Sequence, residues 1–150
     1  LSTYIASQIE ISKLILVAAT PCLVNNENWN YGISSEVFDQ FAINLKNDST
    51  KSLKRFVSLQ SKDKSQLQEL YKSIQKYPAS HSALNTGLEI IINSDLRDIY
   101  KDIAVPKTSI LGSLDTLVPV KIHQWYEAVG SQTFIIRSGH LPFIDKDFKL

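Results

Sequence analysis

Two loops near the end of the chain carry the side chains best suited to acid–base chemistry. Residues 112–119 read Gly-Ser-Leu-Asp-Thr-Leu-Val-Pro and contain Asp115, and residues 138–143 read Ser-Gly-His-Leu-Pro-Phe and contain His140. An imidazole titrates near neutral pH, so it can accept a proton from a nucleophile and return it to a leaving group, while a carboxylate beside it fixes its tautomer. The two loops therefore predict the acid and the base of a Ser-His-Asp relay.

The surrounding sequence predicts that Asp115 and His140 lie side by side. Each loop follows a short apolar run typical of a strand, at residues 108–111 and 133–136. The two residues are 25 positions apart, and the segment between them holds an amphipathic stretch, 120–129, and the second strand, which is enough for a right-handed crossover between parallel neighbours. Both residues would then lie at the carboxyl edge of the sheet, where active sites form. Alternatively, Asp115 forms the turn after its strand or caps the following helix.

The rest of the chain predicts a parallel sheet interrupted by a helical insertion. Residues 12–19 contain a continuous apolar run, as expected of a central parallel strand covered on both faces. Apolar residues then recur at helical spacing in four stripes, at 37–45, 53–59, 67–77 and 84–92. The predicted fold class is α/β, a parallel sheet with an inserted four-helix cap. We divide the chain into a core segment at 1–22, the cap at 23–95 and a core segment at 96–150 that carries the acid and histidine loops.

Composition restricts the environment and the cofactors. The longest strongly apolar run, Leu14 to Ala19, is far shorter than the ~20 residues of a membrane span, and no signal peptide opens the chain. The single cysteine, Cys22, excludes an internal disulfide and fits a reducing compartment, so we expect a cytoplasmic protein. Cys22 is either a nucleophile or, as we favour, a small buried residue. No metal-ligand spacing or phosphate-binding Gly-rich loop is present, so we expect no cofactor.

Charge is distributed unevenly along the chain. The formal net charge is +1, but residues 46–76 contain eight Lys or Arg and three Asp or Glu, so this stretch is +5 and the remainder −4. A basic stretch indicates either an anionic partner or a solvated lysine-rich helical face. Because the stretch lacks a recognition motif, we expect no nucleic-acid binding. His81 and His123 lack the context of His140 and are expected at the surface.

Several motifs resemble those of a known family. The segments Asp95-Leu96-Arg97, Val105-Pro106, 112–119 and 139–143 resemble the second half of α/β-hydrolases. More narrowly, Trp29 and the segments 18–22, 55–60 and 85–90 are similar to the BioH esterases, which cleave pimeloyl-acyl carrier protein methyl ester in biotin synthesis. The resemblance covers nearly the whole chain and implies a carboxylic ester hydrolase with an acyl-enzyme mechanism.

The resemblance also implies roles for individual residues. Asp115 and His140 match the family's catalytic acid and histidine. The family's acyl-substrate site is matched by His140 together with the cap residues Phe56, Val57, Ser58, Leu59 and Gln60. The expected partner is an acidic acyl carrier protein, contacted by Lys51, Arg55 and Lys72 of a monomeric enzyme that does not bind membranes. The alternatives are a general carboxylesterase acting on small free esters, with an incidental basic cap, and a non-catalytic hydrolase-like binding module.

The nucleophile of such a relay has no counterpart in the chain. No Gly-x-Ser-x-Gly motif occurs in the 150 residues, and in α/β-hydrolases the serine precedes the acid and the histidine. The chain contains no Met and opens with the helix-like residues 2–6. We therefore interpret it as the carboxyl-terminal part of a larger protein, with the serine upstream of Leu1, and we expect this chain alone to be inactive.

Overall fold

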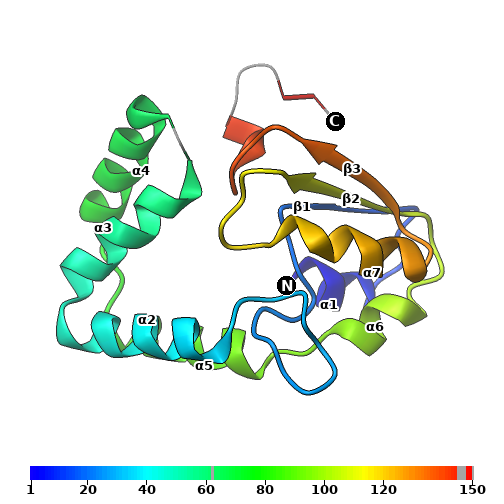
Figure 1. Cartoon of the computed structure of the whole chain (residues 1–150), viewed down its shortest axis with the longest axis horizontal. Coiled ribbons are helices and arrows are strands. Elements are labelled where there is room, and N and C mark those ends of the chain that lie inside the picture. The colour runs from blue at the N-terminus through cyan, green and yellow to red at the C-terminus, as the bar shows by residue number, and fades with distance from the viewer. Residues whose placement is uncertain (62, 145–147, 150) are drawn as a thin grey trace.

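Three parallel strands form the sheet that organises the molecule. The computed structural model describes residues 1–61, 63–144 and 148–149. The strands β1 (Leu14–Val17), β2 (Lys107–Gly112) and β3 (Gln132–Ile136) lie in the order β1-β2-β3 (Figure 1). Leu14 pairs with Lys107, and Thr108 pairs with Gln132. The predicted strand–helix–strand crossover between the acid and histidine loops is therefore present, and the α/β fold class is confirmed.

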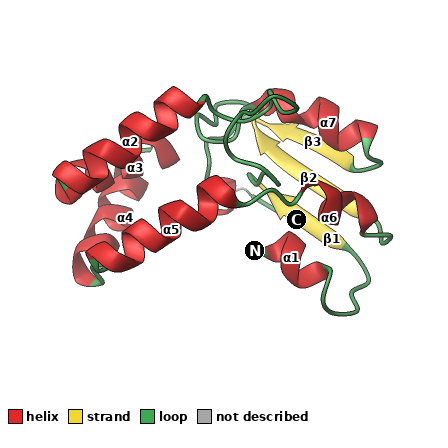
Figure 2. Cartoon of the chain, turned by 90° about the horizontal axis from the view of Figure 1, so that it is seen from below, coloured by secondary structure: helices red, strands yellow, loops and turns green. Residues whose placement is uncertain are grey.

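Seven α-helices and two short 3₁₀ helices accompany the described part of the sheet. Those near the sheet are α1 (Ser2–Ala6), α6 (Arg97–Asp102), η1 (Val120–Ile122), α7 (His123–Ala128) and η2 (Pro142–Ile144). The others are α2 (Ser35–Asn47), α3 (Ser49–Gln60), α4 (Lys64–Lys76) and α5 (His81–Asn93), which form a separate lobe beside the sheet (Figures 1 and 2). The helices α2–α5 are the helical part of the cap. They are the predicted four-helix insertion.

Local capping explains why the insertion breaks into four helices. Each helix starts at a side chain that accepts a hydrogen bond from a backbone N–H of the first turn, which would otherwise lack a partner. These capping residues are Ser34, Asp48, Asp63 and Ser80. The gaps between the four predicted apolar stripes therefore fall at helix boundaries.

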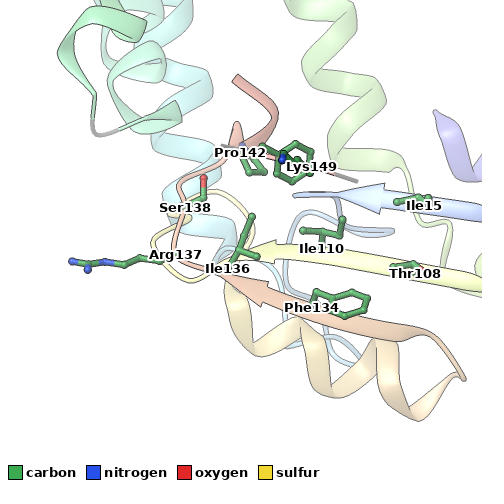
Figure 3. A pocket seen from close by; sticks show the side chains of 10 residues that line it. Ile15, Thr108, Ile110, Phe134, Ile136, Arg137, Ser138, Pro142 and Lys149 are labelled. Carbon is green, nitrogen blue, oxygen red and sulfur yellow. The ribbon is translucent and has the colours of Figure 1, made fainter. Parts of the chain in front are cut away.

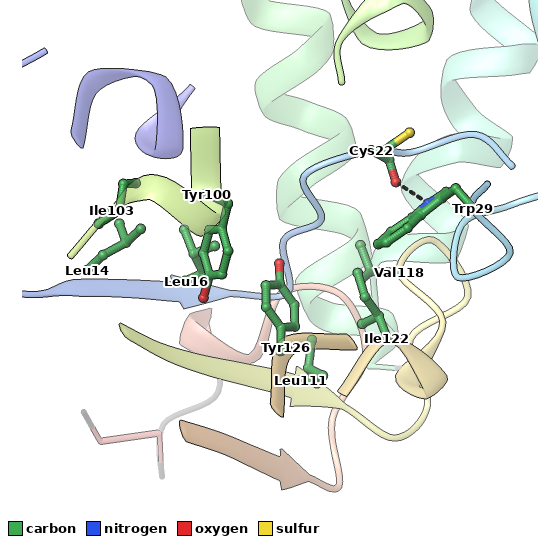
Figure 4. Packing of buried hydrophobic residues seen from close by; sticks show 10 residues of the cluster. All are labelled: Leu14, Leu16, Cys22, Trp29, Tyr100, Ile103, Leu111, Val118, Ile122 and Tyr126. Atoms are coloured by element: carbon green, nitrogen blue, oxygen red, sulfur yellow. Dashed lines mark hydrogen bonds between the residues drawn. The ribbon is translucent and has the colours of Figure 1, made fainter. Parts of the chain in front are cut away.

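The main core lies between one face of the sheet and helices α6 and α7 (Figure 4). Leu16 of β1 and Leu111 of β2 pack there with Tyr100 and Tyr126, both fully buried. Their hydroxyls are satisfied, because Tyr100 donates to Ser131 Oγ at 2.9 Å and Tyr126 donates to the Ala19 carbonyl at 2.9 Å. Burial raises the pKa of Tyr126. The aromatic core thus fixes the helix that connects the two candidate site loops.

The opposite face of β1 differs from the sequence expectation. The apolar run at 12–19 predicted a central strand covered on both faces, but among the described residues β1 forms an edge of the sheet, and Ile15 on its second face is only half-buried. The strand is also shorter than the run, because Ala18 turns the backbone with a φ of 47°. The apolar residues of β1 predicted two buried faces, but the described residues cover the second face only partly.

Two chain segments tie the cap to the core at its base. Cys22 and Asp95 form an isolated antiparallel bridge, and the Leu96 N–H donates to the Pro21 carbonyl at 2.9 Å. The Trp29 indole N–H donates to the Cys22 carbonyl at 2.9 Å (Figure 4). The entry to the cap and the exit from it are thus joined side by side.

No helix in the described ranges combines the length and the apolar character that crossing a lipid bilayer requires.

Candidate active site

The structure brings Asp115 and His140 together at the carboxyl edge of the sheet. Asp115 follows β2 and His140 follows β3, so each lies just beyond the end of its strand. His140 Nδ1 donates to Asp115 Oδ2 at 2.9 Å. With its proton on Nδ1, the imidazole keeps Nε2 free to accept a proton. The pair therefore has the geometry of an acid that orients a base.

Asp115 uses its two carboxylate oxygens differently. While Oδ2 accepts from His140, Oδ1 accepts from the backbone N–H groups of Leu117 at 2.8 Å and Val118 at 3.0 Å. The side chain is only 1% exposed, so a buried charge is compensated by three donors. The same side chain therefore forms the turn after β2 and contacts the histidine.

A glycine lets the two loops pack closely. A Cβ on Gly112 would lie 2.4 Å from the carbonyl oxygens of both Ser138 and Gly139, a distance that no side chain tolerates. The loops are also joined by backbone bonds, from the Ser113 N–H to Ile136 at 2.8 Å and from the Leu114 N–H to Ser138 at 3.0 Å. The close approach of acid and histidine thus depends on a missing side chain at the end of β2.

The histidine side chain remains accessible from one side. Its imidazole is 23% exposed, whereas its backbone N–H is held by the Gln60 carbonyl at 3.1 Å. An exposed ring edge on a fixed backbone is the arrangement that a general base needs. Sequence reasoning did not predict the contact with Gln60, because residues 60 and 140 share no motif or periodic pattern.

Other candidate groups do not join this pair. Cys22 is buried, and burial is the main cause that raises the pKa of its thiol, which disfavours a nucleophilic thiolate. His81 is exposed as expected, but His123 is half-buried, and its Nδ1–H donates to the Val120 carbonyl at 2.9 Å. Across the described ranges, no three His, Cys, Asp or Glu side chains are grouped so as to hold a metal ion.

The cap segment 56–60 lies at the end of α3, beside the histidine loop. Phe56 and Leu59 are half-buried, Val57 is buried in the cap and Ser58 is exposed, because consecutive helical residues point in different directions. Phe56 packs against Phe41 of α2 with ring centroids 5.8 Å apart. A small cavity of about 130 Å³ lies between the end of α3 and the histidine loop, where its lining includes Gln60, Leu114, Ser138 and Gly139.

The three basic residues proposed as carrier contacts are all exposed on the cap. Lys51 and Arg55 lie on α3, and Lys72 lies on α4. Lys54 Nζ lies 5.8 Å from the centre of the Tyr71 ring, so the two helices that carry these cations also contact each other. The exposed charges are therefore presented by one pair of helices.

A larger groove of about 580 Å³ lies on the face of the sheet opposite the main core (Figure 3). Its apolar lining includes Ile15, Ile110, Phe134 and Ile136, one or two residues from each strand. Neither Asp115 nor His140 lines it, so the groove does not contain the candidate chemistry.

The fold and the acid–histidine pair together indicate the class of protein to which this chain belongs. The architecture is that of the carboxyl-terminal part of an α/β-hydrolase. It superposes on an esterase from Exiguobacterium antarcticum with a TM-score of 0.76 and 25% identity, covering 90% of this chain and 52% of that one. A hydrolase from Oleispira antarctica gives a TM-score of 0.79 at 17% identity, covering 93% of this chain and 54% of that one.

In sequence, the chain is similar to one kind of esterase. The pimeloyl-acyl carrier protein methyl ester esterase of Xylella fastidiosa strain M12 is 32% identical over 145 residues, or 90% of this chain and 57% of that protein. Proteins of the same name from Wigglesworthia glossinidia brevipalpis and Pectobacterium carotovorum are 33% and 36% identical, and the chain covers 56% and 60% of them. The chain thus spans less than two thirds of these relatives and matches their carboxyl-terminal part. No family model matches it. The resemblance predicted from the motifs is confirmed.

Proposed function

We propose that this chain is the carboxyl-terminal part of a serine carboxylesterase that cleaves the methyl ester of pimeloyl-acyl carrier protein. The observation that carries the proposal is the 2.9 Å hydrogen bond between His140 Nδ1 and the buried carboxylate of Asp115. The names of the relatives in sequence support the choice of substrate.

In the proposed reaction, the hydroxyl of a serine outside these 150 residues attacks the ester carbonyl. His140 Nε2 accepts the hydroxyl proton as the new C–O bond forms, and it returns this proton to the methoxide that leaves as methanol. A water molecule then attacks the acyl-enzyme in the same way, giving the free carboxylic acid and the serine. Asp115 fixes the imidazole tautomer and stabilises the imidazolium that forms in each half-reaction. No step needs a metal ion or a cofactor.

The cap, which we take as residues 23–95, recognises the substrate. Phe56 and Leu59 offer half-buried apolar surface to the acyl chain, Gln60 borders the small cavity at the histidine loop, and Val57 and Ser58 complete the segment. Lys51, Arg55 and Lys72 attract the acidic carrier protein. The enzyme acts as a monomer in the cytoplasm.

A general carboxylesterase is the second candidate, since the relative of known structure at 25% identity is named simply an esterase. In that case the cap would bind small free esters and its positive charge would play no part in recognition. A hydrolase-like binding module without activity is the remaining alternative.

The deciding experiment compares two substrates and two lengths of protein. The longest protein that the gene encodes should release methanol from the carrier-bound methyl ester and lose this activity when His140→Ala is introduced. The 150-residue chain alone should not hydrolyse p-nitrophenyl acetate above background. Turnover of free esters without preference for the carrier would favour the general carboxylesterase, and no turnover of either would favour the binding module.

A further inference from the structure

We propose that Gln60 is a positioning residue for His140, so that the cap must sit on the histidine loop for the acid–histidine pair to be aligned. The inference rests on the proposed function, because it assigns a role within the same reaction. It concerns the backbone carbonyl of Gln60 and is separate from any contact of its side chain with the substrate.

The end of α3 is built onto the histidine loop. Gln60 is the last residue of α3, and Ser61 leaves the helix in an extended conformation with φ −145° and ψ 160°. The last carbonyls of a helix have no partner within it. The Gln60 carbonyl instead accepts the backbone N–H of His140 at 3.1 Å, so one hydrogen bond both completes the helix end and fixes the histidine backbone.

The contact is also close in space. A Cβ on Gly139 would lie 3.0 Å from the Gln60 carbonyl oxygen, so an added methyl group would have to push the helix end away by a few tenths of an ångström. Gln60 is 7% exposed, yet among the described residues its Nε2 finds no hydrogen-bond partner. A buried unpaired donor opposes this packing. The packing of α3 on the loop therefore persists although no group in the described part of the chain pairs with this donor.

Alignment of His140 thus depends on two elements. Asp115 holds the imidazole from the acid loop, and Gln60 holds the backbone from the cap. The helix that ends at Gln60 also carries Phe56 of the acyl site and Arg55 of the carrier face. A displacement of α3 that lifts its end would release the histidine backbone, and small misalignments of catalytic groups are costly in rate. Substrate recognition by the cap and proton transfer by His140 are coupled through this contact.

Hydrogen exchange of the unmutated protein gives the first test. The His140 amide is protected by its bond to the Gln60 carbonyl, so its exchange should follow the opening of α3. In the longest protein that the gene encodes, the protection factor of this amide and its dependence on denaturant should match those of the last turn of α3. A match to β3 instead, with no dependence on the opening of α3, would overturn the proposal.

The second test displaces the contact by one methyl group. Gly139→Ala should speed exchange of the His140 amide at least tenfold and lower kcat for the methyl ester roughly 10- to 100-fold, with KM within a few-fold, because the binding face of α3 is intact. The matched control is Gly87→Ala in α5, where an added Cβ meets nothing within 4 Å, and it should change neither quantity.

The two proposals can fail separately. If Gly139→Ala leaves His140 exchange and kcat unchanged while the wild type hydrolyses the ester, the coupling is refuted and the esterase function stands. If the exchange results are as expected but no ester is turned over, the structural coupling is supported and the proposed function is refuted.

Discussion

At the scale of single residues, the two carboxylate oxygens of Asp115 have different partners: Oδ1 stabilises the turn after β2, and Oδ2 orients His140. We predict that Asp115→Asn keeps the turn, since the amide oxygen can still accept from Leu117 and Val118, but offers an NH₂ group to His140 and so favours the wrong tautomer. In the full-length enzyme kcat should fall by roughly 10³ to 10⁴, with thermal stability nearly unchanged. Asp98→Asn, at an exposed position of α6, is the control and should remain fully active. Activity of Asp115→Asn within a few-fold of wild type would mean that another acid orients the histidine.

Gly112 and Gly130 offer a matched pair of glycine substitutions. Gly112→Ala puts a methyl group 2.4 Å from two carbonyl oxygens, so we predict that the acid and histidine loops separate, with loss of activity and several degrees of thermal stability. Gly130→Ala meets no atom within 4 Å and suffers only from its positive φ of 78°, which costs about 1 kcal/mol. Thermal melting and kcat of both variants check this order. Equal damage from the two would show that backbone conformation, not the close approach, sets the requirement.

At the scale of elements, the base of the cap is held by an ion pair. The Arg97 guanidinium donates to both carboxylate oxygens of Asp95 and to the Asn28 carbonyl, and it lies 5.3 Å from the centre of the Trp29 ring. Hydrogen bonds from Arg97 hold the pKa of Asp95 below its usual value. The exit of the cap is thereby clamped to its entry.

The lowered pKa makes the contribution of this clamp depend on pH. Because the folded-state pKa of Asp95 lies below its unfolded value of about 3.9, the stabilisation is complete above that pH and is lost as pH falls through the folded value. We predict that Asp95→Asn lowers the free energy of unfolding at pH 7 by up to about 1 kcal/mol, since the Asp95 side chain is 42% exposed. Urea titrations should show this difference shrinking below about pH 4. A difference that persists unchanged at pH 2 would assign the effect to packing instead of charge.

Elements governed by local patterns were predictable from the sequence. The four cap helices coincide with the four predicted apolar stripes because helical spacing is a local pattern, and β2 and β3 follow their apolar runs within one residue. The proximity of Asp115 and His140 was predicted from the right-handed crossover that makes β2 and β3 parallel neighbours. In contrast, the bond from His140 to Gln60 joins residues 80 positions apart, and its donor and acceptor are backbone groups that every residue possesses. No side-chain pattern could reveal it.

At the scale of the whole molecule, the charge of the cap should act at a distance. We predict that replacing Lys51, Arg55 and Lys72 with Ala lowers kcat/KM for a carrier-bound ester and leaves small free esters nearly unaffected, because exposed charges mainly accelerate encounter with a charged partner. Raising ionic strength from 0.1 M to 1 M should produce the same loss in wild type, since the Debye length falls from ~10 Å to ~3 Å. Steady-state kinetics with both substrates test this.

Two results would contradict the carrier interpretation. Equal losses on both substrates would indicate damage to the cap, and no loss on either would return these cations to the role of a solvated face. Lys13, which is exposed and lies outside the cap, provides a control substitution that should affect neither substrate.

The register of the sheet also sets the order in which the chain can fold. Thr108 and its partner Gln132 are 24 positions apart, whereas Leu14 and its partner Lys107 are 93 positions apart with the entire cap between them. Closing the longer loop costs roughly 1 kcal/mol more conformational entropy, and during synthesis the pairing of β1 with β2 must wait until the cap and β2 have been made. We therefore predict that β2, α7 and β3 acquire protected amides first in pulse-labelled refolding, and that β1 is recruited last. The half of the site that contains Asp115 and His140 would then be assembled before the cap has a fixed place.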